Sequence, residues 1–196
     1  HGGTAMLTVT IDFKSPASYL ALEPTLALTR ETGVQIDWLP FSVRPFSVPE
    51  EQAEETVGER HRRVRAVAQR ETWLHYAAVQ GRGMHFAKTP AGSEAALAAM
   101  AGIDGDPVPF MRAAFAAYWK EQADLDDETV VAALLSSVQS TAPDPQSAGE
   151  KLLCLRAEAE ESGIFESPTY VIADQLFVGR EHLPWIRSLI EAAKVA

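Results

Sequence analysis

The order of strand-like and helix-like segments is the feature that most constrains this chain. Residues Met6–Phe13 (MLTVTIDF) are rich in β-forming side chains and predict a buried strand, and Val34–Leu39 predict a second one. Between them, Ser15-Pro16 is a typical helix start, because serine caps a helix and proline is favoured at its first position. The chain therefore opens with a strand–helix–strand unit, which is the usual beginning of an α/β layer.

The middle of the chain, residues 49–141, shows helical patterns and no strand signal. The acidic start Pro49-Glu50-Glu51 predicts a first helix over residues 50–80. Further helices are expected near residues 93–101, 107–122 and 127–140. We interpret this block as an all-helical insertion.

After the insertion the α/β pattern returns. Residues 145–161 predict a helix, Thr169–Ala173 and Leu176–Val178 predict a hairpin, and a closing helix is expected after Gly179. The whole order is that of an α/β thioredoxin fold interrupted after its second strand by an all-helical insertion. We expect residues 4–48 and 142–196 to form the thioredoxin-like domain and residues 49–141 the helical insertion domain.

Charge and composition exclude several classes of partner. The chain has 17 Lys and Arg against 27 Asp and Glu, a formal charge of −10, so nucleic acid and anionic membranes are not expected to bind. No apolar run reaches the roughly 20 residues that span a bilayer. No secretory signal is visible, and His1-Gly2-Gly3 resembles the remnant of an expression tag. We expect a cytoplasmic protein.

Cysteine and histidine usage limits the redox and metal chemistry. The one cysteine, Cys154, excludes an internal disulfide, a cysteine-rich zinc site and a CxxC redox centre. It is expected to be a small buried hydrophobic residue within a helix. The histidines show no ligand spacing, so no metal site is expected.

The first turn carries a candidate reactive group. In a thioredoxin-type fold the reactive group sits where the first strand meets its helix, because the helix N-terminus stabilises a thiolate. Oxidoreductases carry CxxC there, and this chain carries Ser15-Pro16-Ala17-Ser18. A hydroxyl cannot form a disulfide, but it can donate a hydrogen bond to a thiolate that a ligand brings. From this tetrapeptide alone, the simpler interpretation is that Ser15 is an N-cap.

A second candidate segment precedes the hairpin. Ser167-Pro168 stands where thioredoxin folds place a cis-proline that faces the helix N-terminus, and the residue before it presents backbone groups to an extended ligand. A proline at the start of a strand, where no ladder donor is lost, is the alternative interpretation.

Three segments carry a family resemblance: IDFKSPASYLALEPTLAL, AAFAAYWKEQADLDDETVVAALL and GIFESPTYVIADQLFVGREHL. They resemble the 2-hydroxychromene-2-carboxylate isomerase family and its relative, the kappa-class glutathione transferases. The resemblance covers most of the chain. It implies glutathione as cofactor, a small aromatic carboxylate as substrate in aromatic catabolism, and a homodimer.

The resemblance also implies roles for particular residues. Ser15 would activate the thiol of bound glutathione, and Pro16 and Ala17 would line the cofactor. Ser167, before a cis Pro168, would pair with the glutathione backbone.

The implied roles extend past the hairpin. Arg180 and Glu181 would meet the γ-glutamyl end, where a carboxylate suits an ammonium group. The family commonly uses an asparagine after the second strand, and this chain contains none.

We therefore keep three hypotheses: a glutathione-dependent isomerase, a kappa-like glutathione transferase with the same thiolate, and a non-catalytic thioredoxin-like binding module. The missing asparagine supports the third. Consumption of glutathione separates the first two.

Weaker signals come from arginines and aromatic residues. The cluster of five arginines is expected to be a solvated helix face; it comprises Arg60, Arg62, Arg63, Arg65 and Arg70. Arg44 and Arg82 are candidates for holding a substrate carboxylate. Four aromatic residues are candidates for a substrate pocket, although core packing is more typical: Trp38, Phe41, Phe46 and Trp119.

Overall fold

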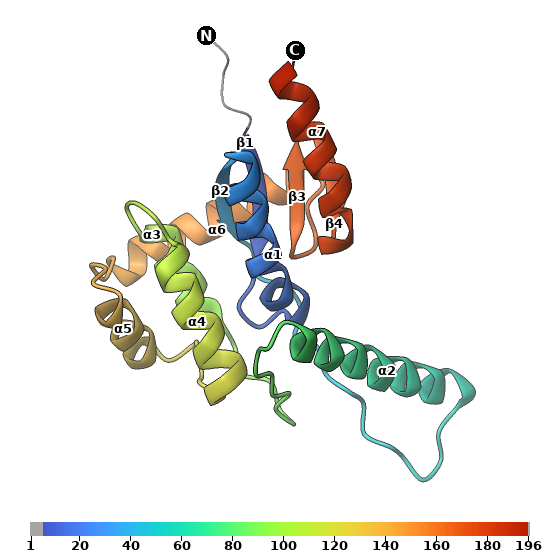
Figure 1. Ribbon diagram of the computed structural model, residues 1–196. Helices are drawn as coiled ribbons and strands as arrows, with labels where there is room; N and C mark the ends of the chain where they lie inside the picture. The colour runs from blue at the N-terminus through green and yellow to red at the C-terminus, as the bar shows by residue number, and fades with distance from the viewer. Residues whose placement is uncertain (1–5, 196) are drawn as a thin grey trace.

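A four-stranded sheet forms the centre of the computed structural model, which describes residues 6–195 (Figure 1). Its order is β2-β1-β3-β4. β1 (Met6–Ile11) runs parallel to β2 (Gln35–Pro40) and antiparallel to β3 (Thr169–Ile172), which pairs antiparallel with β4 (Gln175–Val178). This is the predicted thioredoxin topology. The proposed tag remnant at His1-Gly2-Gly3 lies outside the described residues.

Helices cover both faces of this sheet. α1 (Pro16–Thr32) and α7 (Leu183–Val195) belong to the large core, to which β1 contributes Leu7, Val9 and Ile11. α6 (Pro145–Glu161) packs on the opposite face through a smaller cluster of residues: Phe41, Ala159 and Ile164, with Leu39, Val43 and Val171 against them. Alternate residues of β1 thus face the large core, whereas the cluster against α6 comes from β2, β3 and the segments beside them.

Four helices lie between β2 and α6, in the block that the sequence predicts to be helical. They are α2 (Val57–Val79), α3 (Glu94–Gly102), α4 (Val108–Glu121) and α5 (Glu128–Ser137). α4 joins the insertion to the first turn, because Phe115 packs edge-on against Phe13 with ring centroids 5.0 Å apart. The insertion and the β1–α1 unit therefore share one core.

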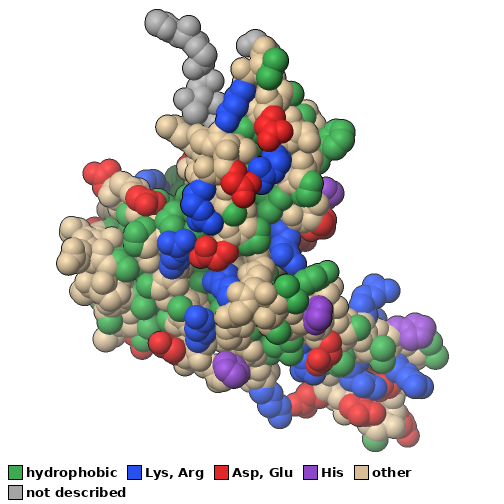
Figure 2. Space-filling view, in the orientation of Figure 1, with side chains coloured by type: hydrophobic (Ala, Val, Ile, Leu, Met, Phe, Trp, Pro, Cys, Tyr) green, Lys and Arg blue, Asp and Glu red, His purple; other side chains and the backbone are tan. Residues whose placement is uncertain are grey.

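The start of α2 corrects a sequence prediction. The helix does not begin at Pro49 but at Val57, where Thr56 and Glu59 form a capping box. Residues 41–56 form a long loop that runs out to the far end of α2 (Figure 1). Only Ala77 of α2 is buried, and charged side chains gather over the helix and its loop (Figure 2).

Three further predictions are corrected. β1 ends at Ile11, because residues 12–14 form the turn into α1, and a short 3-10 helix η1 (Arg180–His182) precedes the closing helix α7. Cys154 is exposed and not buried. The inward stripe of α6 passes through Leu152 and Ala159, and Cys154 stands about 200° around the helix from Leu152.

Candidate functional site

The turn between β1 and α1 places Ser15 at the N-cap of α1. The Ser15 Oγ accepts a hydrogen bond from the Ser18 N–H at 3.1 Å, and the backbone of Ser15 is extended, as the cap position requires. The side chain is buried, with 5% of the residue exposed. Ser15 is therefore the predicted cap, and its hydroxyl proton is still available for another acceptor.

That proton joins the two segments on which the sequence prediction depended. The Ser15 Oγ donates to the Ser167 carbonyl oxygen at 3.0 Å, across 152 positions of sequence. The Ser167–Pro168 bond is cis, as predicted. The Ser167 Oγ donates in turn to the Phe41 carbonyl at 3.0 Å, which fixes this segment against the end of β2.

The backbone around Ser167 offers groups to a ligand. The Ser167 N–H donates to no acceptor within residues 6–195, whereas the Pro168 carbonyl accepts from the Gly179 N–H at 3.0 Å. Pro16 and Pro168 are buried beside this junction, and Ala17 is partly exposed. An extended ligand at this place would find one backbone donor and the N-terminus of α1.

Arg180 and Glu181 lie in η1 and make no hydrogen bond to Ser15 or Ser167 within the described part of the chain. The Arg180 guanidinium lies over the Tyr76 ring of α2, 4.4 Å from its centroid. Glu181 is exposed and folds back toward Gly179, so closely that a Cβ there would clash with its carboxylate. The structure thus places this pair in η1, directly before α7, and no hydrogen bond joins it to the two serines within the described residues.

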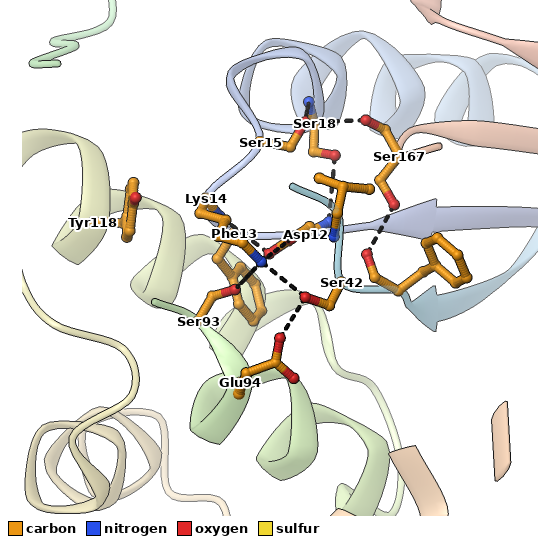
Figure 3. Close-up of polar contacts among 12 residues, drawn as sticks. Asp12, Phe13, Lys14, Ser15, Ser18, Ser42, Ser93, Glu94, Tyr118 and Ser167 are labelled. Atoms are coloured by element: carbon orange, nitrogen blue, oxygen red, sulfur yellow. Dashed lines mark hydrogen bonds and ion pairs between the residues drawn. The ribbon is translucent and has the colours of Figure 1, made fainter. Parts of the chain in front are cut away.

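A buried ion pair lies directly before Ser15 and was not predicted. The Lys14 Nζ is 2.6 Å from the Asp12 Oδ2, and the two side chains are 5% and 0% exposed. The same ammonium donates to Ser42 at 2.9 Å and to Ser93 at 3.1 Å (Figure 3). Strand β1, the end of β2 and the start of α3 therefore meet at Lys14. Nothing in the sequence around Lys14 indicates that this lysine is buried.

A cavity of about 190 Å³ borders Lys14. It lies between the end of α4 and the loop segments that carry Phe46 and residues 85–91. Aromatic side chains form much of its wall: Phe46, Phe86, Tyr118 and Trp119. Of the four predicted aromatic candidates, Phe46 and Trp119 line this cavity. Phe41 is buried in the small cluster against α6, and Trp38 lines a different surface groove.

The aromatic rings of the cavity hold one another in place. Phe86 packs edge-on against Trp119 with centroids 5.2 Å apart, and Phe46 packs edge-on against Trp73 at 4.8 Å. The Trp119 indole N–H donates to the Phe13 carbonyl at 2.9 Å, which fixes this wall to the turn before Ser15. The sequence analysis missed Phe86, which comes from a separate segment that only the fold brings to the cavity, and Tyr118, although it is the direct neighbour of the candidate Trp119.

Tyr118 is the neutral polar group of this wall. Its hydroxyl donates to the Ala91 carbonyl at 3.0 Å. Burial and, to a smaller extent, the negative charges of Asp12 and Asp124 together raise the pKa of Tyr118 to about 12. The tyrosine therefore stays protonated at neutral pH and presents no charge to the cavity.

The sequence as a whole matches the DSBA-like thioredoxin domain over residues 6–191. The chain belongs to that family. Its members are named for disulfide chemistry, whereas Ser15 and Ser18 of this DSBA-like chain stand where a CxxC pair would be. No curated protein sequence matches the chain.

Solved structures with the same fold belong to proteins of different activity. A 2-hydroxychromene-2-carboxylate isomerase is 18% identical, with a TM-score of 0.70 and coverage of 97% of this chain and 99% of that one. A probable DsbA oxidoreductase from Streptomyces coelicolor is 12% identical, with a TM-score of 0.73 and coverage of 96% and 89%. The cytosolic disulfide reductase DsbM from Pseudomonas aeruginosa, solved with glutathione, is 17% identical, with a TM-score of 0.60 and coverage of 97% and 100%. At these identities the likeness establishes the fold.

Of the two arginine candidates in this DSBA-like chain, Arg82 has structural partners. Arg82 donates to the Tyr19 carbonyl at 2.7 Å and lies over the Tyr19 ring at 4.0 Å, so it ties the segment after α2 to α1. Arg60, Arg62 and Arg65 of the cluster are exposed, as a solvated helix face would be. Arg63 is partly buried and forms two hydrogen bonds to Glu55. Arg44 is exposed on the loop after β2.

The expectations of no metal site and no membrane-spanning segment can be compared with the structure over the described residues only. Between positions 6 and 195, no three His, Cys, Asp or Glu side chains come together in a way that could hold a metal ion. Among the helices of that same range, none is long and apolar enough to cross a bilayer.

Proposed function

We propose that this DSBA-like chain is a glutathione-dependent isomerase of the 2-hydroxychromene-2-carboxylate type, acting in aromatic catabolism. The observation that carries the proposal is the pairing of the Ser15 hydroxyl with the Ser167 segment at the N-terminus of α1, next to an aromatic cavity. The near full-length likeness to the isomerase, and to a disulfide reductase solved with glutathione, supports it.

The chain's groups fit glutathione at three points. Ser15 and the N-terminus of α1 offer donors to a sulfur anion. The Ser167 N–H has no acceptor among residues 6–195 and suits a peptide carbonyl. The exposed carboxylate of Glu181 suits an ammonium group, as the resemblance implies. Ser42 follows β2, where the family commonly has a glutathione-binding asparagine. Its hydroxyl accepts a hydrogen bond from Lys14, so we do not assign it the role of that asparagine.

The Ser15 hydroxyl would perform the central step by changing its acceptor. It donates to the Ser167 carbonyl in this structure. Rotation of the hydroxyl would turn its proton to a thiolate, while the Oγ keeps accepting from the Ser18 N–H. Glutathione, when bound, supplies the thiolate that adds to a conjugated double bond and is expelled again. The freed Ser167 carbonyl could then accept from a ligand amide.

The aromatic cavity would hold the substrate beside this group. Its rings offer apolar faces that suit a flat aromatic molecule. His85 lies exposed at the cavity, and we propose that it meets the substrate carboxylate.

Glutathione consumption tests the proposed reaction. The protein is incubated with 2-hydroxychromene-2-carboxylate and with glutathione at a small fraction of the substrate concentration. We expect full conversion to the isomer with all glutathione recovered. Loss of one glutathione per product would instead indicate a kappa-like transferase. Conversion that does not depend on glutathione, or no conversion at saturating glutathione, would contradict the proposal.

A further inference from the structure

The Lys14 ammonium has no donor left for a ligand, although it borders the cavity. An ammonium group has three protons, and Lys14 gives them to Asp12, Ser42 and Ser93. Its side chain is 5% exposed. The role of this cation therefore concerns the groups that surround it within the chain.

Asp12 is the negative member of the pair and shapes the turn that leads to Ser15. Its Oδ1 accepts from the Lys14 N–H at 3.2 Å and from the Ser93 Oγ at 2.6 Å, and its Oδ2 accepts from the Val43 N–H at 2.8 Å. The Asp12 carbonyl accepts from the Ser15 N–H at 3.1 Å. A carboxylate at this place organises the turn, but its charge opposes any anion at the N-terminus of α1.

The field of Asp12 reaches the groups around the site. Its negative charge contributes to the raised pKa of Tyr118, after the larger effect of burial. An anion beside Ser15 lies three residues from this carboxylate along the same turn. The favourable dipole of α1 would be offset there unless a cation compensates for Asp12.

We propose that Lys14 is a positioning residue whose charge cancels that of Asp12 and so keeps the N-terminus of α1 favourable to a thiolate at Ser15. The proposal rests on the proposed function for its role in catalysis, but its physical content concerns only this chain's residues. Asp12 fixes the conformation of the turn, and the positive charge of Lys14 offsets the repulsion between the Asp12 carboxylate and an anion at Ser15.

Other charged or titratable groups surround this turn and stay constant in the test. They come from α3, α4, α6 and the segments before α3 and after α4: Glu94, Tyr118, Arg156, His85 and Asp124.

The test places a thiol at the site without glutathione. Ser15→Cys is made in a Cys154→Ser background, because Cys154 is the one native thiol and is exposed. The rate of alkylation by iodoacetamide at neutral pH then reports the thiolate fraction. Adding Lys14→Met should slow alkylation about tenfold, at the low end of the effect of a nearby like charge on an ionisation.

The opposite substitution should have the opposite sign. Adding Asp12→Asn leaves the cation of Lys14 uncompensated and should speed alkylation severalfold. The double variant Asp12→Asn/Lys14→Met removes both charges and should return to within about twofold of the Ser15→Cys parent. Arg112→Met is the matched control, because it removes a cation from an exposed ion pair with Glu23 of α1 and should change the rate less than about twofold.

Opposite signs in the two single variants would support the proposal. Equal signs, or no change in either, would overturn it, because a purely structural role disturbs the turn in the same direction whichever partner is lost. If Lys14→Met does not fold, Asp12→Asn and the double variant decide: an unchanged or slower rate for Asp12→Asn overturns the proposal. Since no glutathione is present, a failure here is distinct from a failure of the proposed function.

Discussion

The serine cluster at the start of α1 and the aromatic cavity, which borders the same turn at Lys14, differ in chemistry and in origin. We call them the serine wall and the aromatic wall of the proposed site. The serine wall, made of Ser15, Ser18 and Ser167, comes from the thioredoxin-like part and is fixed by hydrogen bonds to backbone groups. The aromatic wall, made of Phe46, Phe86, Tyr118 and Trp119, lines the cavity and is fixed by ring packing. A hydrogen-bonded wall can stabilise charge at one point, whereas a ring-lined wall selects the shape of what binds. We therefore expect the serine wall to set the rate and the aromatic wall to set the affinity.

Loss of the Ser15 hydroxyl should give the largest effect. Removing one positioned donor from an anion typically lowers kcat about 100-fold or more, while loss of an N-cap costs about 1 kcal/mol of the free energy of unfolding. We expect Ser15→Ala to show both, in steady-state kinetics with the isomerase substrate and in urea unfolding.

The control for this prediction is Asp144→Ala, which removes the N-cap of α6, where the Asp144 side chain accepts from the Ser147 N–H at 3.0 Å. It should cost a similar amount of stability and leave kcat unchanged. If Ser15→Ala behaves like Asp144→Ala, Ser15 is only a cap.

The serine wall could be predicted from the sequence, because its signals are local. Ser15-Pro16 is a helix start, and the Ser167-Pro168 segment stands where the resemblance places a cis-proline. That the two segments meet in the fold was implied by the family resemblance, because no local sequence pattern indicates it. The start of α2 was misplaced because Pro49 and its acidic neighbours outweighed the capping box of Thr56 and Glu59, a signal that was also present.

The aromatic wall and the buried ion pair could not be predicted in the same way. Phe46, Phe86 and Trp119 come from three segments, and one aromatic residue in a sequence looks the same in a core as in a cavity. From the sequence, Lys14 would be expected to be solvated. The fold brings Ser93, which is 79 positions away, to its ammonium group. Burial of a charge depends on partners that are distant in sequence.

Shortening the aromatic wall should affect affinity. Phe86→Ala removes a ring that packs against Trp119 and faces the cavity, so we expect KM for the aromatic substrate to rise about tenfold, with kcat changed much less. Steady-state kinetics at saturating glutathione measure both constants. Trp185→Ala, which removes an exposed aromatic side chain from α7, is the control and should change neither. A fall in kcat with unchanged KM would reverse the assignment of the two walls.

The smallest effect concerns Tyr118 and alkaline pH. Because the pKa of Tyr118 is raised from 10.0 to about 12, the folded state favours the protonated phenol, so stability is complete below pH 10.0 and falls as the pH rises toward about 12. Tyr118→Phe should remove about 1 kcal/mol of this fall, less than the full shift implies because the ring borders an open cavity. Burial also raises the pKa values of Tyr19 and Tyr170, so these two residues account for the rest of the fall in stability at alkaline pH. Urea unfolding at several alkaline pH values measures the difference, and identical pH dependence in both proteins would contradict it.

A crystal structure with glutathione tests the central claim most directly. Crystals of the unmodified protein are soaked at millimolar glutathione, with Ser15→Ala crystals treated in parallel. We predict density for the tripeptide with its sulfur next to the Ser15 Oγ and its backbone along Ser167, and weaker density in the variant. Density only at another place, or none at saturating ligand, would contradict the account.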